Sequence, residues 1–224
     1  VGHVTKEGGL AGPKILEHMI DTFIMLDNSS DGRYRILRGH KNRFGAVNEI
    51  GVFAMTDHGM REVPNPSAIF LQRGDFDASG SVTTVTWEGT RSLLVEIQAL
   101  ADDSPSNQPR RIAVGLDHQR LSMQLAIMHR HCAISLSNQD VFINVVGGVR
   151  IQETGSDLAL VLAVLSSLNN RPLPRDLVTF GEVGLTGELR PVVNGQERLR
   201  EASKHGFKKA IVPFANQPKD PVPG

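Results

Sequence analysis

The sequence predicts an α/β protein, and three observations lead to that class. Apolar runs of strand length recur along the chain, for example at 22–26 and 141–146. In the second half, segments such as 158–168 carry apolar residues at helical spacing. Clusters of Gly, Asp and Pro separate these runs and mark turns. Strands that alternate with helices are typical of an α/β domain.

Composition and charge exclude few functions. The 224 residues include 24 Lys+Arg and 24 Asp+Glu, so net charge argues neither for nor against nucleic acid binding. The single cysteine, Cys132, cannot form an internal disulfide. No signal peptide and no apolar run of membrane-spanning length is recognisable, so we expect a cytoplasmic protein without membrane contact.

The first region, residues 1–64, reads as a helix followed by strands. Gly12-Pro13 places proline at a first helical position, ahead of apolar residues up to Ile20. Strands are expected at 22–26 and 34–40, with a polar turn between them. A hairpin over 52–63 should turn at Gly59, where glycine tolerates a positive φ angle.

Prolines 64 and 66, followed by a stretch rich in Gly, Asp and Ser, predict a linker over 65–80. The second region, 81–224, is an α/β unit. Its expected strands are 81–87, 93–99, 111–114, 141–146, 177–180 and 209–213, and its helices follow Asp117, Thr154 and Asn194.

Polar residues mark where these helices begin. Asp117 is a plausible N-cap for a helix whose apolar stripe runs from Leu121 through Leu125 and Met128 to Cys132, a small core residue. Thr154 with Asp157 resembles a capping box, and Asn194 with Glu197 caps a helix that Gly206 ends.

Lys41 and Arg43 are two cations on alternate residues of a predicted strand. Residues two apart in a strand share a face, so the pair would form one cationic edge. Lysine supplies a point charge and arginine a planar fork, a combination that suits a phosphate. A solvated edge strand protected by lysine is the other interpretation.

Lys41-Asn42-Arg43-Phe44-Gly45 resembles the signature pentapeptide of the RadA (Sms) family of bacterial DNA repair ATPases. Gly2–Gly8 and Leu16–Asp21 are similar to that family too, and the resemblance covers essentially the whole chain. It implies that the pentapeptide faces the nucleotide of a neighbouring subunit and is tied to ATP turnover.

The resemblance also implies a fold. Residues 1–64 would be the end of a RecA-like ATPase sheet, and residues 81–224 a Lon protease-like α/β domain, to which Phe180–Pro191 is similar. The implied function is ATP-dependent branch migration of recombination intermediates by a hexamer, in DNA repair and the response to DNA damage. The implied partners are single-stranded and branched DNA and a recombinase.

In that family a zinc module and the phosphate loop precede the region resembled here. ATP and Mg would therefore bind only to the full-length protein, zinc only to the N-terminal module, and the chain alone should be inactive.

Two residues occupy the positions of a Lon-type catalytic dyad. In Lon-type proteases a serine at the start of the central helix attacks the amide and a lysine removes its proton. Ser156 matches the serine position, but the lysine position falls on Gln196, whose amide cannot act as a base. We therefore expect a domain that does not cleave peptides and serves ring assembly and DNA contact.

Basic residues concentrate between 110 and 130. Arg110, Arg111, Arg120 and Arg130, with His118 and His129, could contact a DNA backbone or form a solvated face. The resemblance favours DNA. His129, His131 and Cys132 do not predict a metal site, because helical residues two apart lie roughly 200° apart. For the whole chain, a Lon-type serine peptidase and a non-enzymatic DNA-binding or oligomerisation scaffold remain the alternatives.

Overall fold

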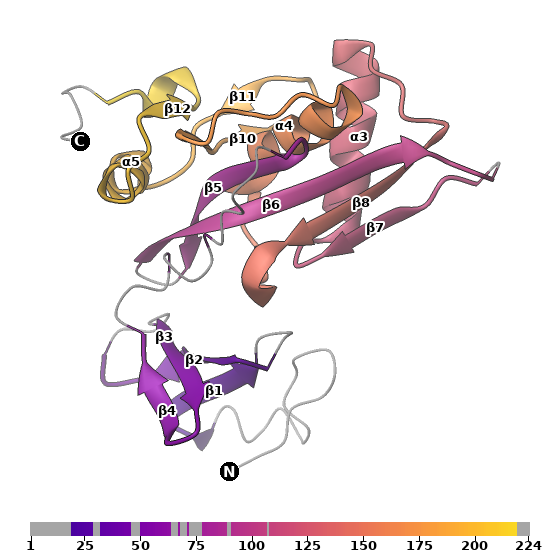
Figure 1. The fold of residues 1–224 in the computed structure, drawn as a ribbon. Coiled ribbons are helices and arrows are strands. Elements are labelled where there is room, and N and C mark those ends of the chain that lie inside the picture. Colours follow the sequence, from indigo (N-terminus) through magenta and orange to yellow (C-terminus); the bar gives the residue numbers. More distant parts are fainter. Residues whose placement is uncertain are drawn as a thin grey trace. The chain divides into compact units, whose positions relative to one another are not determined.

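The computed structural model describes residues 19–28, 32–45, 50–63, 67, 71, 78–88, 91–106 and 108–218. The chain divides into two compact units. The first comprises residues 1–63 and 88–91, and the second residues 64–87 and 92–224. Figure 1 shows the strands and helices of each unit.

The first unit is a four-stranded antiparallel sheet. Its strands are β1 (Thr22–Asn28), β2 (Tyr34–Asn42), β3 (Ile50–Thr56) and β4 (Gly59–Glu62), and they pair in sequence order. The strands and the hairpin predicted here are confirmed, and Gly59 turns the hairpin at a φ of 99°. The helix predicted before Ile20 lies outside the described residues.

The second unit is a six-stranded mixed sheet with helices, which confirms the α/β class. Its strands are ordered β12-β9-β5-β6-β8-β7. They are β5 (Ser81–Glu88), β6 (Arg91–Asp103), β7 (Arg111–Val114), β8 (Gln139–Val145), β9 (Leu177–Thr179) and β12 (Lys209–Ile211). The helices are α3 (His118–Cys132), α4 (Asp157–Leu168) and α5 (Gly195–Lys204). A small hairpin joins β10 (Glu182–Val183) to β11 (Leu189–Arg190), and three 3₁₀ turns are η1 (Val146–Gly148), η2 (Thr154–Ser156) and η3 (Phe214–Asn216).

The helices cover the two faces of this sheet unequally. Figure 1 shows α3 and α4 behind β6 and β8. On the opposite face, Leu199 and Ala202 of α5 pack with Val85 of β5 and Leu94 of β6 in one buried cluster. Towards β8 and β7 that face is exposed: Leu100 of β6 and Ile112 of β7 are 56% and 44% accessible. In the described part of the chain, the portion of this face over β8 and β7 therefore lacks a helical cover.

The connection into β5 is tightly packed. Gly80 has a φ of 86°, and an added Cβ would lie 2.1 Å from the carbonyl oxygen of Ala99. Gly80 also exchanges backbone contacts with β6, since its oxygen accepts a hydrogen bond from Ala99 N at 2.8 Å. A side chain at position 80 would force the start of β5 away from β6.

The start of α3 is as predicted, but the burial of its last residue is not. The Asp117 carboxylate accepts a hydrogen bond from Arg120 N at 2.8 Å, which confirms the N-cap. Leu121, Leu125 and Met128 are buried, whereas Cys132 is exposed. The core position predicted for Cys132 is wrong because it is the last helical residue, and the chain leaves the helix at Ala133 with a φ of 55°.

The other two predicted caps differ in their side-chain contacts. The capping box at Thr154 and Asp157 is wrong: neither side chain caps α4, because each is bonded to a distant part of the chain. Asn194 does precede α5, but it adopts a φ of 58° and its side chain makes no cap hydrogen bond. Gly206, with a φ of 81°, follows the end of that helix as predicted.

Within the described residues, no helix combines the length and apolar character needed to cross a membrane.

Candidate functional site

The pentapeptide Lys41–Gly45 lies where β2 ends. Strand β2 pairs with β1 so that Lys41 stands opposite Phe23 and Gly39 opposite Ile24, which leaves an extra residue in β2 and marks a β-bulge. Because β2 ends at Asn42, Arg43 lies in the bend that follows. The shared face inferred from strand alternation therefore does not extend to Arg43.

Asn42 organises this bend. Its side-chain oxygen accepts hydrogen bonds from the Phe44 amide at 3.1 Å and from the Thr22 hydroxyl at 3.4 Å. Asparagine commonly bonds a backbone amide two residues on, which stabilises a turn. Phe44 is left 81% exposed. The bend therefore presents an aromatic ring and a cation at the surface.

Arg43 is held by Asp21. Its guanidinium donates to the Asp21 carboxylate at 3.0 Å, and its backbone amide donates to the Asp21 carbonyl at 2.9 Å. Both side chains are more than half exposed. An exposed ion pair contributes about 0–1 kcal/mol, so a phosphate could replace Asp21 as the partner of Arg43 at little cost.

Ser156, the serine of the predicted dyad, is buried at the start of α4. It is 1% exposed, and its hydroxyl donates to the carbonyl of Glu153 at 3.5 Å. Gln196 is partly exposed on α5, and no hydrogen bond joins it to Ser156 in the described structure. Among the residues that the structure describes, no basic side chain is found bonded to the Ser156 hydroxyl.

Arg198 of α5 contacts Glu153, which lies three residues before Ser156. Arg198 is fully buried, and its guanidinium donates twice to the Glu153 carboxylate, each time at 2.7 Å. It also donates to the carbonyls of Val85 and Val193, at 2.6 and 3.0 Å. The ring of Phe180 lies 5.7 Å from its central carbon. A permanent cation thus occupies the space between α5 and the turn before α4.

A second ion pair holds the first residue of α4. Arg120 of α3 grips the carboxylate of Asp157 through two nitrogens, one of them at 2.7 Å. Asp157 is 1% exposed and also accepts the amide of Val183 at 3.0 Å. The hydrogen bond to Asp157 raises the pKa of Arg120 above its ordinary value. Asp157 is therefore engaged in tertiary bonding, which explains why it does not cap the helix.

The β10–β11 hairpin is fastened beside these ion pairs. Thr154 donates its hydroxyl to Glu182 at 2.5 Å, and His131 of α3 contacts the carbonyl of Leu185 at 3.0 Å. Within the turn, hydrogen bonds from Thr186, and further from Arg190, lower the pKa of Glu188 to about 2. The β10–β11 hairpin is thus linked to α3 and to the turn before α4.

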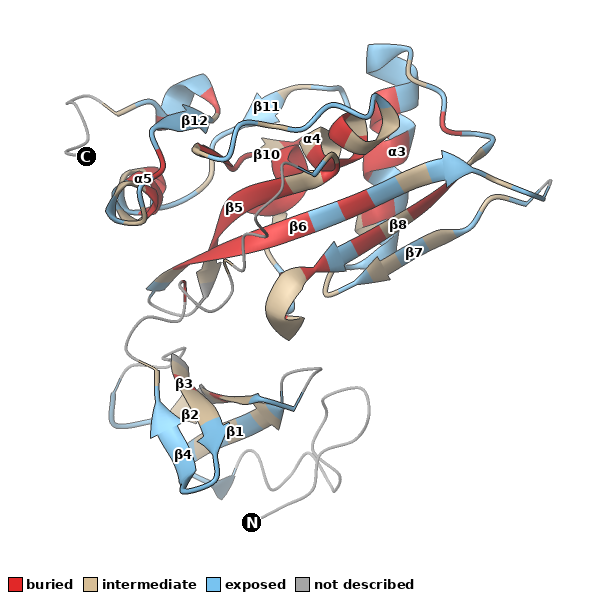
Figure 2. Cartoon of the chain, in the orientation of Figure 1, coloured by how far each residue is buried: buried red, intermediate tan, exposed pale blue. Residues whose placement is uncertain are grey.

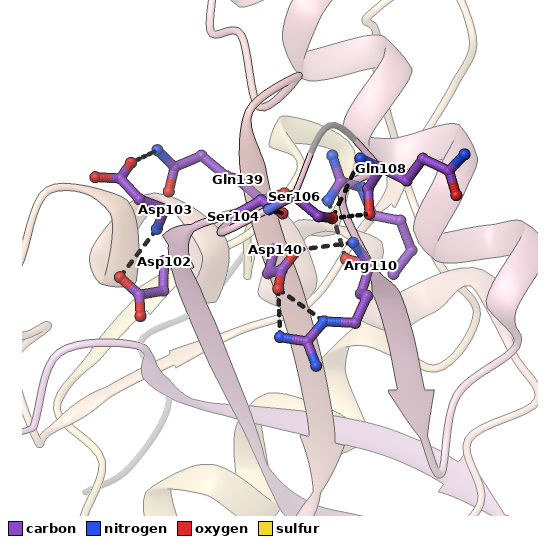
Figure 3. A network of polar contacts seen from close by, with 9 residues as sticks. Asp102, Asp103, Ser104, Ser106, Gln108, Arg110, Gln139 and Asp140 are labelled. Atoms are coloured by element: carbon purple, nitrogen blue, oxygen red, sulfur yellow. Dashed lines mark hydrogen bonds and ion pairs between the residues drawn. The ribbon is translucent and has the colours of Figure 1, made fainter.

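The four arginines proposed for DNA lie in three places. Figure 3 shows Arg110 bonded to Asp140 through its backbone amide and two side-chain nitrogens, at 2.8, 2.8 and 2.6 Å. Its guanidinium stacks over Phe142 at 5.2 Å and stays 60% exposed. Arg111 donates to the carbonyls of Leu136 and Gln139, and its burial lowers its pKa.

Arg120 is committed to Asp157, as described above, and Arg130 is exposed in the last turn of α3. Ten residues of helix separate these two, a rise of about 15 Å. The cluster seen in the sequence is therefore spread over the unit, and a role of these residues in DNA binding stays a prediction.

Sequence patterns missed the two buried ion pairs. Arg198 and Glu153 are 45 residues apart, and Arg120 and Asp157 are 37 apart. A usable signal for Arg198 was its place between Leu199 and Gly195 on the apolar side of α5. Among the residues described, no group of three metal-ligating side chains occurs.

Comparison with known proteins decides the family. Residues 91–216, more than half of the chain, match the family model described as subunit ChlI of Mg-chelatase. The chain belongs to this family. This match is consistent with the predicted Lon-like α/β fold of the second unit.

The chain is also homologous along its length to bacterial RadA proteins, which confirms the predicted resemblance. It is 66% identical over 224 residues to the DNA repair protein RadA of Salmonella typhimurium, covering 100% of this chain and 49% of that protein. It is 47% identical over 216 residues to the DNA repair protein RadA of Bacillus subtilis, covering 96% of this chain and 47% of that protein. The chain thus spans about half the length of these curated relatives.

Proposed function

We propose that this chain works in DNA repair as part of an ATP-dependent motor that processes and branch-migrates recombination intermediates. The observation that supports this best is the identity to RadA proteins along the whole chain, which includes the pentapeptide at the end of β2. ATP and Mg would bind a phosphate loop that this chain does not contain. Branched or single-stranded DNA and a recombinase are the proposed partners.

In this proposal Lys41–Gly45 acts on the nucleotide of a neighbouring subunit. Arg43 suits that role because its partner, Asp21, is exposed and exchangeable. A guanidinium supplied from a second subunit stabilises the charge that develops on a transferring phosphoryl group. The homo-oligomer, proposed as a hexamer, would bring the bend of one subunit to the nucleotide of the next.

The second unit is proposed as a Lon-like domain without peptidase activity, kept for assembly and DNA contact. Its serine is buried, the serine hydroxyl bonds the Glu153 carbonyl, and among the described residues no basic side chain is found bonded to it. The buried cation that α5 places on the Glu153 carboxylate is an arginine and not a lysine. These contacts disfavour a Lon-type peptidase. A pure scaffold is the remaining alternative.

The test of the motor is Arg43→Ala in the full-length protein. DNA-stimulated ATP hydrolysis and branch migration should both be measured. An arginine acting in trans contributes about 10³- to 10⁵-fold to phosphoryl transfer, so we expect a loss of that order in turnover. Arg61→Ala, at an exposed residue of β4, is the matched control and should leave turnover unchanged. Wild-type rates in both assays for Arg43→Ala would refute the role of the pentapeptide.

A further inference from the structure

The uncovered face of the large sheet carries a row of apolar side chains. Leu100 of β6, Phe142 of β8 and Ile112 of β7 stand opposite one another across three strands. With Val114, which is 52% exposed, they line a hollow of about 500 Å³. Figure 2 shows the exposed residues along β6 and β7. A contiguous apolar surface of this kind marks an interaction site.

Carboxylates flank this hollow along β6. Glu96 and Asp102 share the face of Leu100, because alternate residues of a strand point the same way. Glu96 is only 6% exposed, and its carboxylate accepts hydrogen bonds from Ser81 and Gln98 at 2.7 and 2.9 Å. Both donors are neutral, and no ion pair to Glu96 is found in the part of the chain described.

We call this hollow, together with the two carboxylates that stand beside it on β6, the acidic hollow. Leu100, Ile112, Val114 and Phe142 are among the residues that line it, and Glu96 and Asp102 flank it on the same face of β6. Arg110 at its rim does not offset these charges, because it is already bonded to Asp140. A buried carboxylate with neutral partners is stabilised by an approaching cation. The acidic hollow therefore suits an apolar group that has lysines beside it.

The opposite edge of the same sheet offers such a group. Phe214 is 90% exposed on η3, and Ile211 of the edge strand β12 is 42% exposed. The turn that carries Phe214 is braced, since the Asn216 side chain accepts from Val192 N and donates to Val192 O, both at 2.9 Å. The exposure of Phe214 thus belongs to an ordered turn.

Lysines accompany these apolar side chains. Lys208 and Lys209 line a groove between α5 and β12 together with Ile211 and Phe214, and no acidic residue is among the described residues that line it. Lys209 also contacts Asp176 at 3.3 Å, an exposed pair that contributes little. The side chains of Lys208, Lys209, Ile211 and Phe214 border this groove and are exposed, and we call the four together the basic knob.

We propose that the basic knob of one copy of this chain docks into the acidic hollow of a second copy. Charge and apolar character are complementary between the two surfaces. They cannot meet within one copy, because β12 and β7 are the outermost strands of the sheet and lie about 24 Å apart. A contact between two different surfaces repeats from copy to copy and closes into a ring where the rotation allows. The inference rests on the homo-oligomer of the proposed function and assigns its contact surfaces.

The test is a mixing experiment with the whole 224-residue chain. Phe214→Glu disables the knob and Leu100→Glu disables the hollow. Each variant should associate about thirtyfold more weakly than the unchanged chain, the loss expected for one buried anchor of an interface. Mixed together, the two should form a dimer and nothing larger, because one retains its hollow and the other its knob. Sedimentation velocity measures all three samples.

Charge reversal provides a second pair of variants at exposed residues. Lys208→Glu and Asp102→Lys should each weaken association, and the double variant should regain it. Leu185→Glu, at a 70% exposed residue that lines neither surface, is the matched control and should assemble normally. Circular dichroism melts verify folding of every variant.

The outcomes separate this inference from the proposed motor. Assembly of the unchanged chain that none of these variants disturbs would overturn the knob and hollow and leave the oligomer standing. A mixture of Phe214→Glu and Leu100→Glu that stays monomeric would also overturn the contact. A strictly monomeric unchanged chain would overturn both the contact and the oligomer, whereas the motor is tested separately by Arg43→Ala turnover.

Discussion

Two arginines, one in each unit, are held in opposite ways. Arg43 of the first unit pairs with an exposed aspartate at the surface, and both side chains stay more than half accessible. Arg198 of the second unit is entirely buried and bonded to Glu153, Val85 and Val193. The exposed pair can exchange its partner at little cost, whereas the buried pair cannot be opened without leaving charges in the protein interior. The first suits contact with a ligand, and the second fixes a structure.

This difference bears on the two candidate sites. In the bend of the pentapeptide, the guanidinium of Arg43 can bind a phosphate in place of Asp21, because the pair is exposed. At the degenerate peptidase position, the Ser156 hydroxyl bonds the carbonyl of Glu153, and the carboxylate of Glu153 is paired with the buried Arg198. A site of the Lon type needs a lysine able to discharge near neutral pH, and the Arg198–Glu153 pair provides the opposite property.

Breaking the buried pair should have the largest effect. Arg198→Met retains apolar bulk but removes the cation paired with Glu153, which keeps the hydrogen bond from Trp87 N at 2.7 Å, and removes the guanidinium donor to the Val85 carbonyl. We expect a loss of about 3–5 kcal/mol in the free energy of unfolding. Thermal melting should fall by roughly 6–20 °C.

Changing Glu153→Leu together with Arg198→Met removes both charges, and this double variant should recover part of the loss. A melting temperature within about 2 °C of the unchanged chain for Arg198→Met alone would show that the pair contributes no more than a surface contact.

Breaking the exposed pair should have a small effect on stability. Arg43→Ala removes a contact worth about 1 kcal/mol or less. The expected fall in melting temperature is at most about 4 °C. High salt should reduce the difference further, because exposed charges are screened. A drop as large as that of Arg198→Met would mean that the bend after β2 is structural, and the exchange argument for Arg43 would fail.

Changes at the peptidase positions should have no effect on proteolysis. Incubation with an unfolded substrate, with and without ATP, should give no cleavage by the unchanged protein. Gln196→Lys should gain none, because Ser156 stays buried and Arg198 still occupies the adjoining space. Cleavage that disappears in Ser156→Ala would establish an active site that uses a base from elsewhere in the fold.

Local signals predicted the fold well where local contacts decide it. The strand at 22–26, the hairpin at Gly59 and the Asp117 cap each depend on residues within a few positions of one another. Predictions failed where distant partners compete. Thr154 and Asp157 have capping-box spacing, but their side chains form hydrogen bonds with Glu182 and Arg120, which are 28 and 37 residues away in the sequence.

The candidate sites divide in the same way. The pentapeptide was recognisable because its letters are contiguous, although the bulge and the end of β2 alter how Lys41 and Arg43 project. The place of Arg198 on the apolar side of α5 was the one local signal of its burial, and that signal was missed because an arginine near the start of an amphipathic helix is usually solvated. Exposure of Cys132 followed from where α3 ends, which the apolar stripe alone did not specify.

The bonds of Arg198 also bear on the order in which the second unit folds. Its guanidinium joins β5 and the turn before α4 to the last helix, across 113 and 45 residues of sequence. Contacts this distant form only after the intervening chain has been ordered, which slows folding. Until α5 docks, the Glu153 carboxylate lacks its ion-pair partner. We therefore expect α5 to dock late in the folding of the second unit, after the strand and the turn that its arginine joins have formed.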